Sequence, residues 1–96
     1  MLEKYIEQTL VKEIRVLKGL CLKLSCPAFA GMPDRLILLS KGRIAFVEVK
    51  RKGEEPRPLQ ISRHRLLRKL GFKVFVLDDK KQIKEIIEEI TGGDAE

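Results

Sequence analysis

The sequence predicts an α/β fold in which a mixed β-sheet is flanked by helices. Apolar residues recur at the spacing of a helix in three segments and at the spacing of a strand in four others. These segments follow one another in the order α-β-β-β-α-β-α, with no internal repeat. Elements in such an order bury their apolar sides by packing in layers, and 96 residues suffice for one such unit. We therefore expect residues 1–96 to form a single domain.

The first helix is predicted over residues 2–17. Gly19 follows it, at a position where glycine commonly ends a helix. In residues 20–25 three leucines alternate with other residues, which is the period of a strand, and a loop with two prolines comes next. The apolar stripe of the helix has one residue per turn: Leu2, Ile6, Leu10, Ile14 and Leu17.

A β-hairpin is predicted from two apolar strands, residues 34–39 and 43–50, around a short turn that ends in Gly42. Glycine is preferred at the last position of a three-residue turn, because the backbone there is left-handed. We therefore predict a three-residue turn in which Gly42 has a positive φ and Leu39 pairs with Arg43.

The register of this hairpin decides which charged side chains meet. The three-residue turn places Asp34 directly across from Glu48, whereas a two-residue turn would place it opposite Val49, facing away. Because side chains alternate along a strand, Glu48 and Lys50 project from the same face. The predicted register therefore brings two carboxylates and an ammonium group together at the end of the hairpin.

The second half of the chain is predicted to hold two helices and a strand. Residues 51–57 are charged and form an exposed loop, after which a helix begins at Pro58 and ends at Gly71. Residues 72–77 form a strand, and one of the two aspartates after it is suited to cap a last helix. The apolar positions are Leu59, Leu66, Leu67 and Leu70 in the first of these helices and Ile83, Ile86, Ile87 and Ile90 in the second.

Two opposed carboxylates beside a lysine indicate metal chemistry. Asp34 and Glu48 repel each other across neighbouring strands, and a hard cation such as Mg²⁺ or Mn²⁺ would turn that repulsion into coordination. A bound cation lowers the pKa of a water and stabilises charge on a phosphate, and Lys50 could orient that water or neutralise charge. The alternative is a solvent-facing pair of Glu48 and Lys50, against which the very apolar sequence of residues 45–50 argues.

Three motifs resemble the VRR-NUC branch of the PD-(D/E)XK nucleases. They are Gly31-Met32-Pro33-Asp34-Arg35, Phe46-Val47-Glu48-Val49-Lys50 and Pro58-Leu59-Gln60. A lone Glu-x-Lys occurs by chance, but the three motifs in this order and at these element positions are more specific. The resemblance runs from the first helix to the strand that ends near Leu77. It implies an αβββαβ core like that of restriction endonucleases, with an extra C-terminal helix here.

The resemblance also implies roles for individual residues. Asp34 and Glu48 match the metal-binding carboxylates of the family, to which the backbone carbonyl of Val49 is added as a metal ligand. Lys50 matches the catalytic lysine, and Gln60 matches a glutamine that lies close to the active site. All but Val49 are therefore expected in the catalytic set.

The family further uses a glutamate on the first helix, as a catalytic and metal-binding residue. Glu7 is our choice for it, since an apolar pair follows at residues 10–11. Glu3, one turn earlier, and Glu13 are the alternatives, and each of the three could instead be an ordinary solvated carboxylate.

The substrate expected from the resemblance is DNA. Small stand-alone members look like phage or prophage proteins that cut branched DNA, such as Holliday junctions, as homodimers; two matched nicks require two symmetrically placed sites. We therefore expect a homodimeric endonuclease that depends on Mg²⁺ or Mn²⁺ and selects branched DNA. The alternatives are a nicking or restriction-like nuclease on duplex DNA and a catalytically idle DNA-binding module.

The charge of the chain suits a nucleic-acid partner. Twenty Lys and Arg residues against 14 Asp and Glu give a net charge of +6, which favours polyanions through counterion release. His64 is left out of the catalytic set, because a lone histidine on an exposed helix usually has no chemical role. Basic residues cluster after Lys50, where they would contact phosphates without reading sequence: Arg51, Lys52, Arg57, Arg63, Arg65 and Arg68.

The remaining features concern location. No apolar run reaches the roughly 18 residues of a membrane-spanning helix, and the first residues do not look like a signal peptide. We expect a cytoplasmic protein of a bacterium or a phage-infected cell, in which Cys21 and Cys26 stay reduced.

Overall fold

The computed structural model describes residues 2–93 and has the predicted order of elements. Apart from α3, each element begins and ends within two residues of the predicted segment. The longest helix has 14 residues, and no helix in this range is long and apolar enough to cross a lipid bilayer. The elements are α1 (Glu3–Val16), β1 (Leu20–Lys23), β2 (Arg35–Leu39), β3 (Arg43–Val49), α2 (Pro58–Lys69), β4 (Lys73–Leu77) and α3 (Ile83–Thr91), with 3₁₀ turns at Ser40–Gly42 and Lys80–Gln82.

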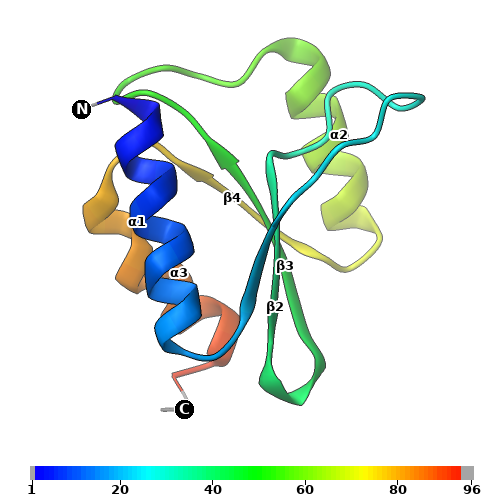
Figure 1. Ribbon diagram of the computed structural model, residues 1–96. Coiled ribbons are helices and arrows are strands. Elements are labelled where there is room, and N and C mark those ends of the chain that lie inside the picture. The colour runs from blue at the N-terminus through cyan, green and yellow to red at the C-terminus, as the bar shows by residue number, and fades with distance from the viewer. Residues whose placement is uncertain (1, 94–96) are drawn as a thin grey trace.

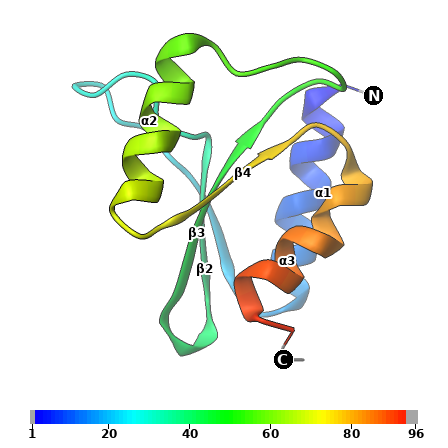
Figure 2. The ribbon, with the colours of Figure 1, turned by 180° about the vertical axis from the view of Figure 1, so that it is seen from behind.

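The four strands form one mixed sheet in the order β1-β2-β3-β4. β2 runs antiparallel to both β1 and β3, and β4 runs parallel to β3. In Figure 1, and from behind in Figure 2, α1 and α3 lie side by side on one face of the sheet, and α2 lies on the other. The predicted architecture, a mixed sheet flanked by helices, is confirmed.

The turn between β2 and β3 has the predicted length. Leu39 pairs with Arg43, and Gly42 has a φ of 70°. Lys41 is also left-handed, with a φ of 65°, so the turn is a kinked 3₁₀ turn with two left-handed residues. The left-handed conformation is sterically unfavourable for a residue other than glycine, so the glycine at position 42 alone did not predict the conformation of Lys41.

The face of the sheet under α1 and α3 holds the main core. One residue per turn of α1 points into it, as the apolar spacing predicts. Leu2, which was expected on this stripe, is 58% exposed because it precedes the first turn of α1. The buried residues of this core are Ile6, Leu10, Ile14, Ile37, Leu39, Ala45, Val47, Val49, Leu77, Ile83, Ile86 and Ile90.

The last helix starts later than the aspartate pattern predicts. Asp79 does act as a cap, accepting a hydrogen bond from the backbone N–H of Lys81 at 3.0 Å, but the turn that it caps is 3₁₀. The α-helix begins only at Ile83, and Gly92 ends it in the left-handed conformation. Its isoleucine stripe is directed at the sheet as expected.

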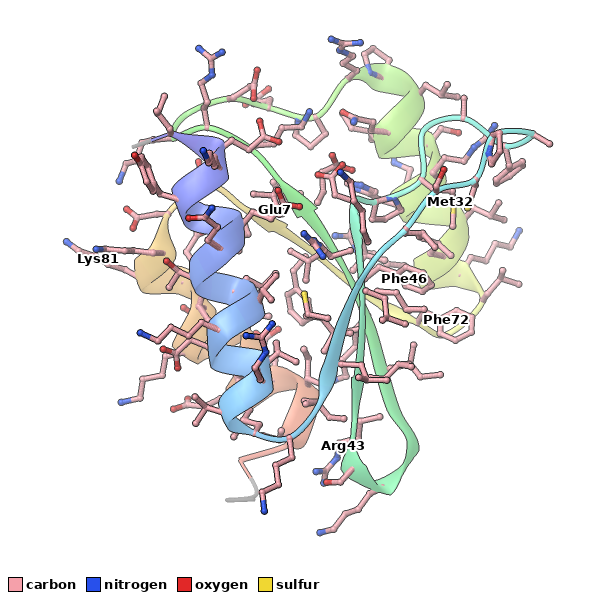
Figure 3. All side chains as sticks on the ribbon, viewed as in Figure 1. Glu7, Met32, Arg43, Phe46, Phe72 and Lys81 are labelled. Atoms are coloured by element: carbon pink, nitrogen blue, oxygen red, sulfur yellow. The ribbon has the colours of Figure 1, made fainter. Side chains whose placement is uncertain are left out.

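The opposite face of the sheet carries a smaller apolar cluster, and here the prediction for α2 was wrong. Phe46 and Val74 of the sheet pack with Leu67 of α2, and the ring of Phe46 meets that of Phe72 edge to face at 5.7 Å (Figure 3). His64, which was expected on an exposed helix, is only 2% exposed. Three leucines that were expected on the apolar side of the helix face solvent instead: Leu59, Leu66 and Leu70.

Candidate active site

Two carboxylates meet where β2 begins and β3 ends. Arg35 pairs with Val47 at the end of the β2–β3 ladder. Continuing this register by one residue on each strand places Asp34 across from Glu48. Their side chains are hydrogen-bonded to each other. Asp34 Oδ2 also accepts the backbone N–H of Val49 at 2.9 Å, which holds the carboxylate against the edge of β3. The meeting of the two acids that the three-residue turn predicted is therefore present.

Glu48 is buried and surrounded by polar groups from three elements. Its side chain is 1% exposed. Gln60 Nε2 donates to Glu48 Oε2 at 3.1 Å, and His64 Nε2 lies 3.4 Å from Oε1. Lys50 Nζ is 3.9 Å from Oε2, on the same face of β3 as the period of two requires. The expected residues Asp34, Lys50 and Gln60 are thus gathered around one buried carboxyl group.

The charges at this centre are not balanced. Burial raises the pKa of Glu48, and repulsion by Asp34 and the hydrogen bond to it raise that pKa further, to about 8; Lys50 acts in the opposite direction. Burial also lowers the pKa of His64, as does the positive charge of Arg68. A pKa of about 8 favours the protonated form of Glu48 at neutral pH, and a bound cation would favour the ionised form instead.

A divalent cation fits the donors present. Asp34 and Glu48 offer carboxylate oxygens, which are the ligands that Mg²⁺ and Mn²⁺ prefer. The backbone N–H of Val49 donates to Asp34. In a strand the N–H and C=O of one residue point to the same neighbouring strand, so the carbonyl of Val49 is also on the side of Asp34, where a third ligand is expected. Within residues 2–93 no group of three His, Cys, Asp or Glu side chains is placed to hold a metal ion.

Two carboxylates of α1, Glu3 and Glu7, differ in their surroundings. Glu7 accepts a hydrogen bond from Arg35 Nε at 2.8 Å, and this ion pair lies between α1 and the sheet (Figure 3). Burial raises the pKa of Glu3, and so does the nearby charge of Asp34. Arg35 thus binds the carboxylate of Glu7, whereas the charge of Glu3, the alternative one turn earlier, reaches Asp34; which of the two serves the cation stays a prediction.

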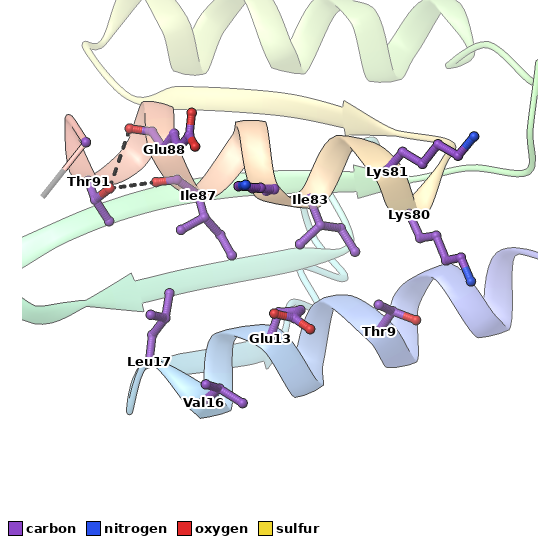
Figure 4. A pocket seen from close by; sticks show the side chains of 12 residues that line it. Thr9, Glu13, Val16, Leu17, Lys80, Lys81, Ile83, Ile87, Glu88 and Thr91 are labelled. Atoms are coloured by element: carbon purple, nitrogen blue, oxygen red, sulfur yellow. Dashed lines mark hydrogen bonds between the residues drawn. The ribbon is translucent and has the colours of Figure 1, made fainter. Parts of the chain in front are cut away.

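Glu13 lies elsewhere. It lines the groove between α1 and α3, together with Thr9, Ile87 and Lys84, and this groove shares no residue with the carboxyl pair (Figure 4). It therefore has no part in the candidate site.

Three of the six basic residues expected at DNA also hold the fold together. Lys52 forms an ion pair with Asp79, and Arg68 donates to the carbonyl of Val74 at 2.8 Å. Arg63 donates to the carbonyl of Ala30 at 2.8 Å and stacks on the ring of Phe29. The others, Arg51, Arg57 and Arg65, are exposed.

The residue that sequence reasoning missed is His64. A signal was available: Gln60 and His64 are four residues apart and share one face of α2 with Leu67. A helix with a polar stripe of this kind as well as a leucine stripe can face the sheet with either one.

Comparison with known proteins identifies the family. No protein-family model matches the chain. Among solved structures, a chain described as "VRR_NUC domain" superposes with a TM-score of 0.85 and 38% identity, covering 90% of this chain and 94% of that one. "Putative nuclease p44" of Acyrthosiphon pisum secondary endosymbiont phage 1 is 45% identical over 78 residues, which are 81% of this chain and 84% of the relative. The chain therefore belongs to the VRR-NUC family of nucleases.

Proposed function

We propose that this nuclease hydrolyses phosphodiester bonds of DNA with the help of Mg²⁺ or Mn²⁺. The observation that carries the proposal is the pairing of Asp34 with the buried Glu48 beside Lys50. Burying two acids in contact is costly for a sheet unless a cation or a proton joins them. A site of that kind has a chemical use that a purely structural pair lacks.

Asp34, Glu48 and the carbonyl of Val49 would hold the cation, with the charge of Glu3 nearby. When bound, it makes a water more acidic and offsets negative charge on the scissile phosphate. The protein supplies the rest. The N–H of Val49 fixes Asp34, and Lys50 is placed to orient the attacking water or to neutralise charge that develops on the phosphate.

The basic surface supports a polyanionic substrate. Arg51 and Arg57 belong to the loop and helix start that follow Lys50, and Arg65 extends this surface along α2. Contacts from such side chains to phosphates position a duplex without reading its sequence. We propose that selectivity comes from DNA shape, with branched DNA such as Holliday junctions as the preferred substrate.

A second copy of the chain would give the paired sites that a junction needs. In Figure 1 the β2–β3 hairpin extends beyond the end of α2. Near its turn, a row of apolar side chains crosses the face of the sheet on which α2 lies. Register aligns Leu20, Leu38 and Ile44 in this row, and Phe72 continues it before β4. Leu20 is 55% exposed, Ile44 40% and Phe72 37%. Exposed apolar surface of this extent supports a homodimer.

Cleavage of a matched set of substrates tests the proposed activity. The protein is incubated with a four-way junction, linear duplex and single strand, in Mg²⁺, in Mn²⁺ and in a chelator. We expect metal-dependent cutting that is fastest on the junction, and none by Asp34→Asn. Equal cutting of all substrates would remove the selectivity; binding without cutting under every condition would favour an idle DNA-binding module.

The homodimer is tested by light scattering. We expect the native chain to have the mass of a dimer, and Leu20→Asp or Ile44→Asp to have that of a monomer. Val16→Asp is the matched control, because Val16 is 69% exposed on α1, under the other face of the sheet. A native chain that is monomeric at all concentrations would exclude the dimer.

A further inference from the structure

We propose that His64 is a positioning residue that holds the carboxylate of Glu48 in the orientation required for the cation. The inference rests on the proposed function, which places a cation at Glu48. It assigns His64, which the family motifs around Asp34, Lys50 and Gln60 do not include, to the same site.

The contacts of Glu48 are divided between its two oxygens. Oε1 lies 3.4 Å from His64 Nε2, and Oε2 accepts from Gln60 Nε2 at 3.1 Å. Gln60 and His64 are one turn apart on α2, so a single helix supplies one group to each oxygen. A carboxylate held at both oxygens cannot rotate freely about its last bond.

The glutamine of this pair is itself held in one orientation. Its Oε1 accepts the backbone N–H of Arg57 at 2.8 Å, so its Nε2 is the end that faces Glu48. Nε2 therefore donates to Oε2. When Glu48 is ionised, both of its oxygens can only accept hydrogen bonds, so His64 must present Nε2–H to Oε1.

The packing of α2 buries His64 in preference to two of its leucines. The helix has leucines available for its inner face, yet Leu66 and Leu70 are exposed and His64 is 2% exposed. Burying a polar ring is unfavourable unless its nitrogen finds a partner, and Glu48 is that partner. The helix is thus oriented by its polar contacts to Glu48 as well as by Leu67.

Each oxygen of Glu48 accepts one hydrogen bond from α2 and keeps a further lone pair for a cation or for Lys50. Groups that orient metal ligands in this way typically contribute about 10–100-fold to metal affinity. The proposal therefore predicts an effect of His64 on cation binding in the absence of DNA.

Calorimetric titration of Mn²⁺ into the protein without DNA tests this prediction. His64→Phe keeps the ring and removes its nitrogens, and we expect its Mn²⁺ affinity to fall about tenfold or more. His64→Gln offers an amide N–H to Oε1 and is expected to stay within about threefold of the native affinity. Leu66→Ala, on the exposed side of α2, is the control and is expected to bind as the native protein does.

Two further readouts separate positioning from folding. Binding of a DNA duplex in chelator is expected to be equal in all variants, and cleavage by His64→Phe is expected to recover as Mn²⁺ is raised. If His64→Phe does not fold, as judged by circular dichroism, His64→Leu takes its place. Native affinity in the Phe or Leu variant, or an equal loss in the folded Gln variant, overturns the role of His64. A native protein that binds no Mn²⁺ overturns the proposed function itself.

Discussion

One face of the β-sheet carries Ile37, Val47 and Leu77 under α1 and α3, whereas the other carries Glu48 and Phe46 under α2. Both faces use residues of the same strands, since successive side chains point to opposite sides. The first face is closed by two helices, and its buried centre is apolar, with the ion pair of Arg35 and Glu7 at one end. The second is divided into a polar centre at one end of β3, a small apolar cluster and an exposed apolar row.

Stability therefore rests mainly on one face of the sheet, and the residues suited to chemistry gather on the other. Glu48 lies between Val47 and Val49 in the sequence, and both valines point into the closed core. The strand that carries the buried acid is therefore held by packing on its other side. A rigid support of this kind keeps charged groups in positions that would otherwise relax apart.

The largest expected effect is on the polar face. Replacing Glu48 by Gln should reduce cleavage by on the order of 10³-fold, since a ligand and its charge are lost. The melting temperature at pH 8.5 without metal should not fall, because the repulsion with Asp34 is removed. Cleavage assays and calorimetric melting of the same samples measure the two. Native cleavage by this variant would place the chemistry elsewhere.

A change on the closed face should have the opposite pattern. Leu10 is completely buried, and Leu10→Ala should lower the free energy of unfolding by about 2–5 kcal/mol through loss of apolar contact and the cavity left behind. Below its melting temperature this variant should cleave at the native rate. Leu70→Ala is the matched control; Leu70 is 64% exposed, so its loss should change stability by under about 0.5 kcal/mol. Urea unfolding followed by circular dichroism gives both values.

The buried acid of the polar face should also make the stability of the protein depend on pH, an effect that the closed face does not contribute. The pKa of Glu48 is raised from 4.5 to about 8, so the folded protein holds a proton that the unfolded chain releases. The stability this provides is complete below pH 4.5 and is lost as the pH rises through 8. Above pH 7 His64, whose pKa is lowered from 6.5 in the folded protein, is mostly neutral in both states.

We therefore expect the melting temperature of the metal-free protein to fall between pH 7 and pH 9, and Mg²⁺ to restore it most at pH 9. Glu48→Gln should lose this part of the pH dependence. Differential scanning calorimetry of both proteins in the two buffers measures the difference. A native protein and a Gln variant with parallel pH profiles would show that Glu48 does not hold the extra proton.

The closed face could be predicted from the sequence almost completely. α1 and α3 each have a single apolar stripe, so each helix can bury it against the sheet in only one orientation. The turn that ends in Gly42 fixed the hairpin register, and with it the meeting of Asp34 and Glu48. These features depend on local geometry, which a sequence pattern contains.

The orientation of α2 could not be predicted in the same way. Its sequence has a leucine stripe and a polar stripe, and hydrophobicity favours burying the leucines. The buried stripe is decided by Glu48, which needs partners and lies on a strand distant in the sequence. The choice between Glu3 and Glu7 is open for a related reason, since both lie on one face of α1 and Arg35, which pairs with Glu7, comes from a strand distant in the sequence.

The smallest effects concern that last pair. Glu3→Gln removes a charge that reaches Asp34 and should weaken Mn²⁺ binding and cleavage severalfold, with little change in stability. Glu7→Gln breaks a partly buried ion pair with Arg35 and should cost up to about 1 kcal/mol, because exposed and half-exposed pairs contribute little. Its cleavage at saturating metal should match that of the native protein. Titration of Mn²⁺ and urea unfolding of both variants separate the two carboxylates. If Glu7→Gln were the variant that loses Mn²⁺ affinity, then Arg35 would have to release Glu7 when the cation binds, and Glu7 would belong to the polar centre after all.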